Sequence, residues 1–206
     1  STSINLGAGV FQIEDDGPNA VVNAQATLDT LVLDETRAVG TEEDGDSAPT
    51  GLDTVTANFA DNFAAVTDYG SDGAGSTAYT LALTGANVAS GLYALDVADT
   101  VTSDGDGIGQ GAQIVLNQSS NTITGAVGGT DYFTISIDNG TGVVTFTQLA
   151  NIWHSSTASD DDTSTLTLAT ANLLQVVQTV TDRDGDKDST SINLGAGVFQ
   201  IEDDGP

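Results

Sequence analysis

The stretch STSINLGAGVFQIEDDGP occupies residues 189–206, and the same letters, without one difference, occupy residues 1–18. The two copies begin at residues 1 and 189, so the sequence repeats itself after 188 positions. Identity over such a stretch predicts a tandem array, in which stacked repeats rather than one reactive centre carry the function. We therefore expect residues 1–18 to be the tail strand and linker of a preceding repeat. Residues 19–206 are then one full repeat that forms a single elongated module.

The repeated stretch has the pattern of a strand that closes a domain. Apolar residues recur through SINLGAGVFQI, residues 3–13, and again through residues 191–201. Such a pattern predicts a half-buried strand. The acidic linker EDDGP follows, and Pro18 ends the strand because its ring nitrogen has no N–H for a sheet hydrogen bond.

Between the two copies, short runs rich in Val, Ile, Thr, Tyr and Phe recur between turns of Gly, Asp, Asn and Ser. These runs predict an all-β fold, an extended immunoglobulin-like β-sandwich of antiparallel strands with little helix. The clearest hairpin is residues 131–148, where Asp138, Asn139 and Gly140 can supply the left-handed conformations of a tight turn. Residues 148–154 are expected to form a short helical turn. The other expected strands are residues 19–35, 54–59, 62–70, 77–85, 91–97, 112–118, 122–128, 165–170 and 173–182.

The charge of the chain is one-sided, with 30 Asp and Glu against 3 Lys and Arg and a formal net charge of -27. This charge excludes binding to nucleic acid, argues against anionic membrane surfaces and favours cations as partners. No cysteine is present, so disulfides and thiolate metal sites are excluded, and no apolar run is long enough for membrane insertion. We expect the isolated module to be a monomer. The alternative explanation of the charge is an acidic surface that only keeps the protein soluble in salt.

The strongest candidate metal site is DRDGDKD, residues 182–188. Its ligands would be four aspartates at alternate positions, Asp182, Asp184, Asp186 and Asp188, whose carboxylates can converge on one hard cation with six to eight oxygen ligands. The loop is not an EF-hand, because Gly185 stands at its fourth position rather than the sixth and Asn193 rather than Glu stands at its twelfth. If the closing strand runs the length of the domain, this loop faces the linker of the preceding copy. The alternative is that Arg183 and Lys187 pair with the aspartates and no metal binds.

Other acidic residues extend the set of candidate calcium ligands. Consecutive carboxylates in the linkers repel one another unless a divalent ion or a solvated, flexible chain relieves the repulsion. Carboxylates that follow strands are weaker candidates, since each can be a solvated strand end. The linker candidates are Glu14, Asp15 and Asp16 with their counterparts Glu202, Asp203 and Asp204, and the strand-end candidates are Asp34, Glu35, Asp68 and Asp72.

Three features that suggest catalysis or ligand binding have simpler explanations. The glycines of residues 105–111 lack the lysine of a phosphate-binding loop and lie beside aspartates. His154, the only histidine, adjoins Trp153, the only tryptophan, and packing explains the pair. One histidine without cysteine builds neither a zinc site of the usual kind nor a thiol protease centre. We expect no enzymatic activity.

Three segments together resemble the long repeats of giant RTX adhesins, bacterial surface proteins exported by type I secretion. They are TVTDRDGDKDSTSINLGAGVFQIEDDGP (179–206), LVLDE (31–35) and YFTISIDNGTGVVTFTQ (132–148). The resemblance implies a secreted, cell-surface extender module that is stacked many times in adhesion and biofilm proteins. It also implies several Ca²⁺ per repeat, which stiffen the modules and the linkers between neighbouring copies. The alternative is a β-sandwich that itself binds a glycan through calcium.

Overall fold

The computed structural model describes residues 2–7, 9–35, 54–102, 105–156 and 162–203. Within these ranges the chain is all-β, as the sequence predicts, with one short 3₁₀ turn, η1 (Phe59–Asn62). No helix among the described residues is long and apolar enough to cross a membrane. The strands are β1 (Leu31–Asp34), β2 (Thr54–Asn58), β3 (Ala74–Leu83), β4 (Val88–Leu95), β5 (Gln110–Ser119), β6 (Thr122–Val127), β7 (Thr130–Ile137), β8 (Val143–Gln148), β9 (Thr163–Thr167), β10 (Leu174–Asp182), β11 (Lys187–Asn193) and β12 (Ala196–Glu202).

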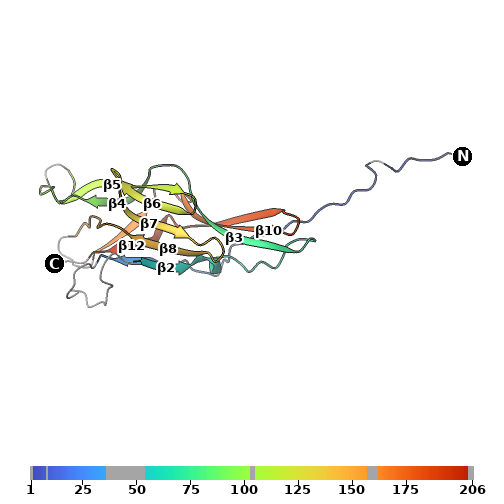
Figure 1. The fold of residues 1–206 in the computed structure, drawn as a ribbon, viewed down its shortest axis with the longest axis horizontal. Helices are drawn as coiled ribbons and strands as arrows, with labels where there is room; N and C mark the ends of the chain where they lie inside the picture. The colour runs from blue at the N-terminus through green and yellow to red at the C-terminus, as the bar shows by residue number, and fades with distance from the viewer. Residues whose placement is uncertain (1, 8, 36–53, 103–104, 157–161, 204–206) are drawn as a thin grey trace.

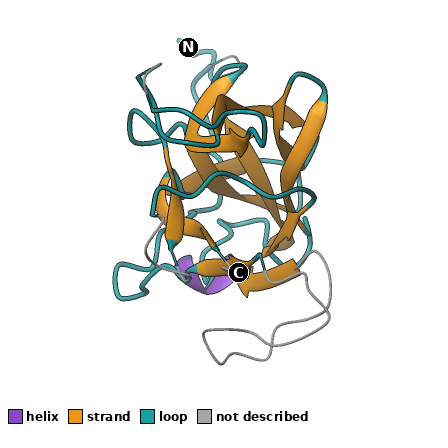
Figure 2. Ribbon diagram, turned by 90° about the vertical axis from the view of Figure 1, so that its left-hand side faces the viewer, coloured by secondary structure: helices purple, strands orange, loops and turns teal. Residues whose placement is uncertain are grey.

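The strands form three sheets around one core (Figures 1 and 2). A six-stranded antiparallel sheet has the order β2-β8-β7-β6-β5-β4. Two three-stranded sheets, β11-β10-β3 and β1-β12-β9, complete a sandwich-like fold. Every pairing is antiparallel except that of β1 with β12, which is parallel. That parallel pair brings the chain after β1 beside the chain after β12.

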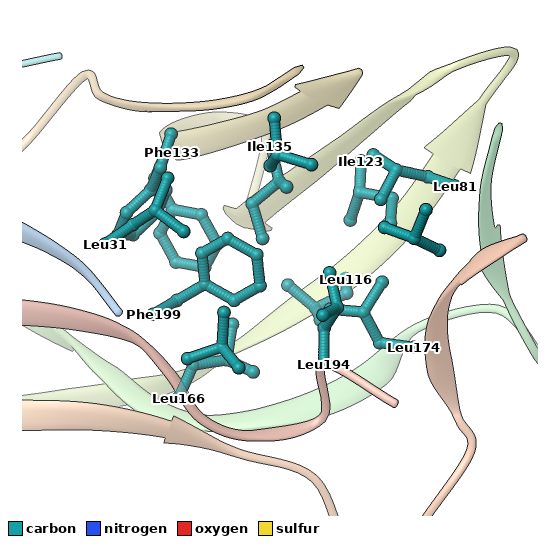
Figure 3. Close-up of a cluster of buried hydrophobic side chains, with 14 of the residues drawn as sticks. Leu31, Leu81, Leu116, Ile123, Phe133, Ile135, Leu166, Leu174, Leu194 and Phe199 are labelled. Carbon is teal, nitrogen blue, oxygen red and sulfur yellow. The ribbon is translucent and has the colours of Figure 1, made fainter. Parts of the chain in front are cut away.

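The core follows from the alternation of side chains along the strands. In β10, buried and half-buried residues alternate over the whole strand, as expected where one face packs on a core. Three phenylalanines from different strands meet in the hydrophobic core. Phe146 lies edge-on to Phe133 and to Phe199, with ring centroids 5.5 Å and 5.2 Å apart. Figure 3 shows Leu31 beside Phe133 and Leu166 beside Phe199 in this cluster. Such T-shaped contacts add to the energy of apolar burial.

The C-terminal copy of the repeated stretch joins the two small sheets. Its first half is β11, which pairs with β10, and its second half is β12, which lies between β1 and β9. Leu194, between the two strands, is fully buried, and its N–H donates to the carbonyl of Leu174 at 2.8 Å. The stretch therefore closes the domain, as the sequence predicts.

The N-terminal copy behaves differently, and the prediction of a strand at residues 3–13 is wrong for it. The described residues of this copy form no strand, and the segment extends away from the domain (Figure 1). None of the strands in the described ranges pairs with this segment. The two termini of the chain lie at opposite ends of the long axis, and the β10–β11 turn lies at the N-terminal end (Figure 1).

Other local predictions also need correction. Residues 62–70 make only an isolated bridge, Val22 with Phe63, instead of a strand. Residues 148–154 form no helical turn, because Ile152 instead bridges to Ala94. The hairpin at residues 131–148 is present as β7 and β8, but the left-handed residue in its turn is Gly142 rather than residues 138–140. Asp138 holds the turn through its side chain, which accepts hydrogen bonds from the N–H groups of Gly140 and Thr141.

Candidate metal centres

The linker that ends the N-terminal copy, residues 14–18, docks on the module together with residues 19 and 20. The N–H of Ala20 donates to Asp188 Oδ2 at 2.8 Å, and the N–H of Asn19 donates to the carbonyl of Asp68 at 3.2 Å. The carbonyl of Asp16 accepts a hydrogen bond from the N–H of Ser71 at 3.2 Å. The linker is therefore fixed against both the β10–β11 turn and the loop before β3.

Gly70 makes this docking possible. Its φ is +72°, a left-handed conformation that L side chains rarely adopt. A Cβ atom at this position would lie 1.6 Å from the carbonyl oxygen of Asp16, which is an impossible contact. Only glycine lets the linker backbone approach so closely.

Docking brings carboxylates of the linker and of the DRDGDKD loop together. Asp15, Asp184 and Asp186 each place one oxygen within 4.8 Å of the others, and Asp72, Asp182 and Asp184 do the same. Asp184 belongs to both groups, so the two form one cluster, here called the joint cluster, of Asp15, Asp72, Asp182, Asp184 and Asp186. The sequence predicts that this loop faces the preceding linker, and the structure confirms that contact.

Asp182 is the buried member of the joint cluster, with only 3% of its surface exposed. Its Oδ1 accepts the N–H groups of Gly185 at 2.9 Å and Asp186 at 2.8 Å, which folds the turn around it. Its Oδ2 is buried without a hydrogen-bond donor. A buried carboxylate oxygen that faces other carboxylates and no donor is a position where a cation binds favourably.

The pKa shifts in the joint cluster reflect this crowding. Contact with Asp15 is the main cause that raises the pKa of Asp72 and of Asp186, and contact with Asp182 raises the pKa of Asp184. Burial acts to raise the pKa of Asp182, but hydrogen bonds from backbone N–H groups, including those of Gly185 and Asp186, outweigh burial and lower it. Simultaneous ionisation of the cluster is therefore unfavourable without a cation.

In the described part of the chain, no Lys or Arg side chain neutralises the joint cluster. Neither Arg183 nor Lys187 comes within ion-pair distance of a carboxylate there. The described residues thus do not support the alternative in which these two residues pair with the aspartates. All the side-chain ligands available in the joint cluster are carboxylate oxygens, the set that Ca²⁺ prefers.

The remaining predicted ligands lie elsewhere. Asp188 is turned to the linker backbone, as described above, and Asp68 caps its own turn by accepting the N–H of Gly70 at 3.1 Å. Glu14 is exposed and belongs to neither group of carboxylates. Asp34 lies opposite Glu202 in the parallel ladder of β1 and β12. Asp204 lies outside the described residues.

A second cluster, here called the distal cluster, consists of Glu35, His154 and Asp203. Each places one ligand atom within 4.8 Å of the others. Glu35 is 4% exposed, so it is not a solvated strand end. Its carboxylate accepts hydrogen bonds from the side chain of Gln148, from the N–H of Ile152 at 2.8 Å and from Asn151 Nδ2 at 3.2 Å.

His154 was missed as a functional residue by the sequence reasoning. Its side chain is 4% exposed, its Nδ1 lies 3.2 Å from Ser164 Oγ, and its Nε2 lies 3.7 Å from Glu35 Oε2. Burial acts to lower the pKa of His154, but the nearby carboxylate of Glu35 and the charge of Asp203 outweigh burial and raise the pKa. The sequence offered one signal, that His154 is the only histidine, since Glu35 and Asp203 lie far from it along the chain.

A small cavity of about 160 Å³ lies next to the distal cluster and is lined in part by Tyr93, Trp153 and Ser164. Trp153 contacts Tyr93 edge-on, with ring centroids 6.1 Å apart, and its indole N–H donates to the carbonyl of Ile108 at 2.8 Å. The packing explanation for Trp153 thus agrees with its contacts. The cavity is smaller than the roughly 300–1,000 Å³ typical of small-molecule sites.

The family comparison gives one result. The profile described as "Domain of unknown function (DUF5801)" matches residues 30–195, from the residue before β1 to the residue after Leu194. No curated protein and no solved structure matches the chain significantly.

Proposed function

We propose, from the joint cluster and from the resemblance to RTX adhesin repeats, that this chain is a calcium-stabilised extender module of a long bacterial surface adhesin. The chain belongs to the DUF5801 family, whose description names no activity. The observation that carries this proposal is the joint cluster, in which Asp15 of the linker meets Asp184 and Asp186 of the module. A calcium ion bound there links a module to the chain that precedes it.

The repeat makes this contact a joint between copies. Asp15 and Asp203 occupy the same place in the two copies of the repeated stretch, so in a tandem array residue 203 of one module is residue 15 of the next. Residues 1–13 then correspond to residues 189–201, which form most of β11 and β12, and this explains why the large apolar side chains described in the N-terminal copy are exposed. The joint cluster fixes the angle between neighbours when calcium neutralises its carboxylates.

The shape of the module fits this role. The termini lie at opposite ends of an elongated domain (Figure 1), so copies joined end to end extend the array along its axis. The net charge of -27 favours cations and disfavours nucleic acid and anionic membranes. The proposal includes neighbouring copies and Ca²⁺ as partners and no enzymatic activity, and the resemblance to RTX adhesin repeats adds secretion to the bacterial surface.

Small-angle scattering on two consecutive copies tests the extender. In millimolar calcium we expect a stiff rod with one well-defined maximum dimension. In EDTA, or when the central linker carries the substitution equivalent to Asp15→Asn, we expect a broader range of shapes. Scattering curves that stay the same in all three conditions would show that calcium does not set the joint.

The second candidate function is glycan binding through the cavity beside Trp153 and Tyr93. Its aromatic lining is the observation in favour, and its small volume argues against it. Binding of a glycan at micromolar affinity that is lost with Trp153→Ala would favour this candidate over a purely structural module.

A further inference from the structure

The distal cluster differs from the joint cluster in ligand chemistry. The joint cluster offers only carboxylate oxygens, whereas the distal cluster combines two carboxylates with the imidazole of His154. Imidazole is a ligand of zinc and of the other late first-row divalent metals, whereas calcium takes oxygen ligands. The two clusters therefore suit different ions.

The imidazole is oriented for metal binding. Ser164 Oγ lies 3.2 Å from Nδ1, and when Nδ1 donates to this hydroxyl, Nε2 is left with its lone pair. Nε2 is buried and has no hydrogen-bond partner. It faces Glu35 Oε2 at 3.7 Å, with an Asp203 carboxylate oxygen also within 4.8 Å. Three electron-rich atoms thus converge, and no donor from the described residues reaches Nε2.

Distances in the cluster fit a small ion. Ligand atoms bound at 2.0–2.2 Å in a tetrahedral shell lie roughly 3.4 Å apart. The 3.7 Å between His154 Nε2 and Glu35 Oε2 would need to shorten by only a few tenths of an ångström. Asp203 is half-buried just after β12 and offers an oxygen within 4.8 Å of both atoms, so it would move closer to complete the shell.

Three hydrogen-bond donors already orient the carboxylate of Glu35. Gln148 and Ile152 N–H donate to Oε1, while Asn151 donates to Oε2 and leaves room on that oxygen. Groups of this kind fix the direction of a metal-binding carboxylate and support its affinity. A surface-exposed acidic patch has no such donors.

From these contacts we propose that Glu35, His154 and Asp203 bind one late first-row divalent ion of the zinc type, at the end of the module opposite the joint cluster. In this chain the site shares no residue with the joint cluster, whereas in a tandem array residue 203 of one module is residue 15 of the next, so one aspartate would face both sites. Three protein ligands leave a coordination position open to water or to another ligand. The ion would tie the end of β12 to the segment after β1 and to the chain after β8, and so stabilise the start of the outgoing linker.

Zinc alone is the probe that tests this proposal. The chain, free of any histidine tag, is titrated with Zn²⁺ in the presence of saturating Ca²⁺, so that the joint cluster is occupied. We expect one Zn²⁺ per chain. The variants His154→Gln and Asp203→Asn should weaken that binding at least about tenfold, the lower limit for loss of a supporting group. The control is Asp15→Asn, the same change in the other copy of the repeat, which should leave Zn²⁺ affinity unchanged.

Nuclear magnetic resonance of the unaltered chain provides a second readout, which does not depend on whether a variant folds. His154 is the only histidine, so its ring nitrogens give an unambiguous ¹⁵N signal. Zn²⁺ should shift the Nε2 resonance strongly, and Ca²⁺ should not. An unshifted Nε2 signal, equal Zn²⁺ binding by all variants, or displacement of Zn²⁺ by Ca²⁺ would overturn the proposal. Failure of the calcium joint would instead appear as unchanged calcium binding in Asp15→Asn.

Discussion

The same sequence occurs twice in this chain and adopts two structures. In the C-terminal copy Phe199 and Ile201 are 0% exposed, whereas their counterparts Phe11 and Ile13 are 80% and 101% exposed. The letters are identical, so local propensity is identical, and only the neighbours differ. β10, β1 and β9 pair with the C-terminal copy, whereas no strand of the part of the chain that the structure describes pairs with the other. The strands are therefore a product of tertiary packing, in line with the context dependence of β-structure.

The linker aspartates extend this comparison to chemistry. Asp15 lies among carboxylates, and Asp203, its counterpart, lies beside His154 and Glu35. One residue type in one sequence context thus meets two different sets of ligands. Under the proposals above, the first set takes calcium and the second takes a zinc-type ion.

The largest expected difference is between Phe199→Ala and Phe11→Ala. Truncation of Phe199 removes a fully buried ring that packs edge-on against Phe146, and such changes cost about 3–5 kcal/mol of unfolding free energy. Truncation of Phe11, an exposed residue, should change stability by no more than about 0.5 kcal/mol. Urea unfolding of the two variants measures both values. Equal losses would mean that the N-terminal copy also packs against the domain.

Calcium removal should have the next largest effect. An ion that binds only the folded chain adds about 2.7 kcal/mol at a hundredfold excess over its Kd. For a chain of this size, EDTA should then lower the Tm by roughly 5–11 °C for one site. Differential scanning calorimetry with calcium and with EDTA gives the shift, and sodium chloride of equal ionic strength is the control. A Tm that follows ionic strength alone would favour an acidic surface without a specific ion.

A pair of glycine variants isolates the docking of the linker. Gly70 and Gly73 both have a left-handed φ, +72° and +82°, but only a Cβ at position 70 would strike the linker carbonyl, since position 73 is open. Each alanine substitution should cost roughly 1–2 kcal/mol for the backbone conformation. Gly70→Ala should in addition weaken calcium binding, because the linker must move away from the loop. Equal calcium affinities in Gly70→Ala and Gly73→Ala would show that the docked linker does not contribute ligands.

The smallest effect concerns pH and again contrasts two aspartates. Hydrogen bonds from Thr141 lower the pKa of Asp138, so its contribution to stability is present above the unfolded value of 3.8 and is lost as pH falls through the lower folded value. Contact with Asp15 raises the pKa of Asp186, so without calcium the folded state loses stability as pH rises through that higher folded value. Unfolding measured from pH 3 to pH 6 in EDTA should show opposite changes on Asp138→Asn and Asp186→Asn. Changes of the same sign would contradict the assigned environments.

The sequence predicts the all-β class because alternation is strong and local, as in β10 and the β7–β8 hairpin. It also predicts the contact between the DRDGDKD loop and the preceding linker, since a closing strand that spans the domain leaves them at one end. The distal cluster could not be predicted in the same way. It depends on the parallel pairing of Asp34 with Glu202, residues far apart in the chain, and on a bridge that turns the segment after β8 inward. Non-local pairings of this kind leave no periodic signal in the sequence.

Calcium titration of the single chain by calorimetry tests the central claim most directly, with matched substitutions in the two copies of the linker. We predict that the unaltered chain binds Ca²⁺, that Asp15→Asn weakens this binding at least about tenfold, and that Asp203→Asn leaves it unchanged. Asp15 and Asp203 carry the same neighbours in sequence, so only their surroundings in the fold can produce such a difference. Equal calcium binding by the two variants and the unaltered chain would contradict a calcium-set joint between modules.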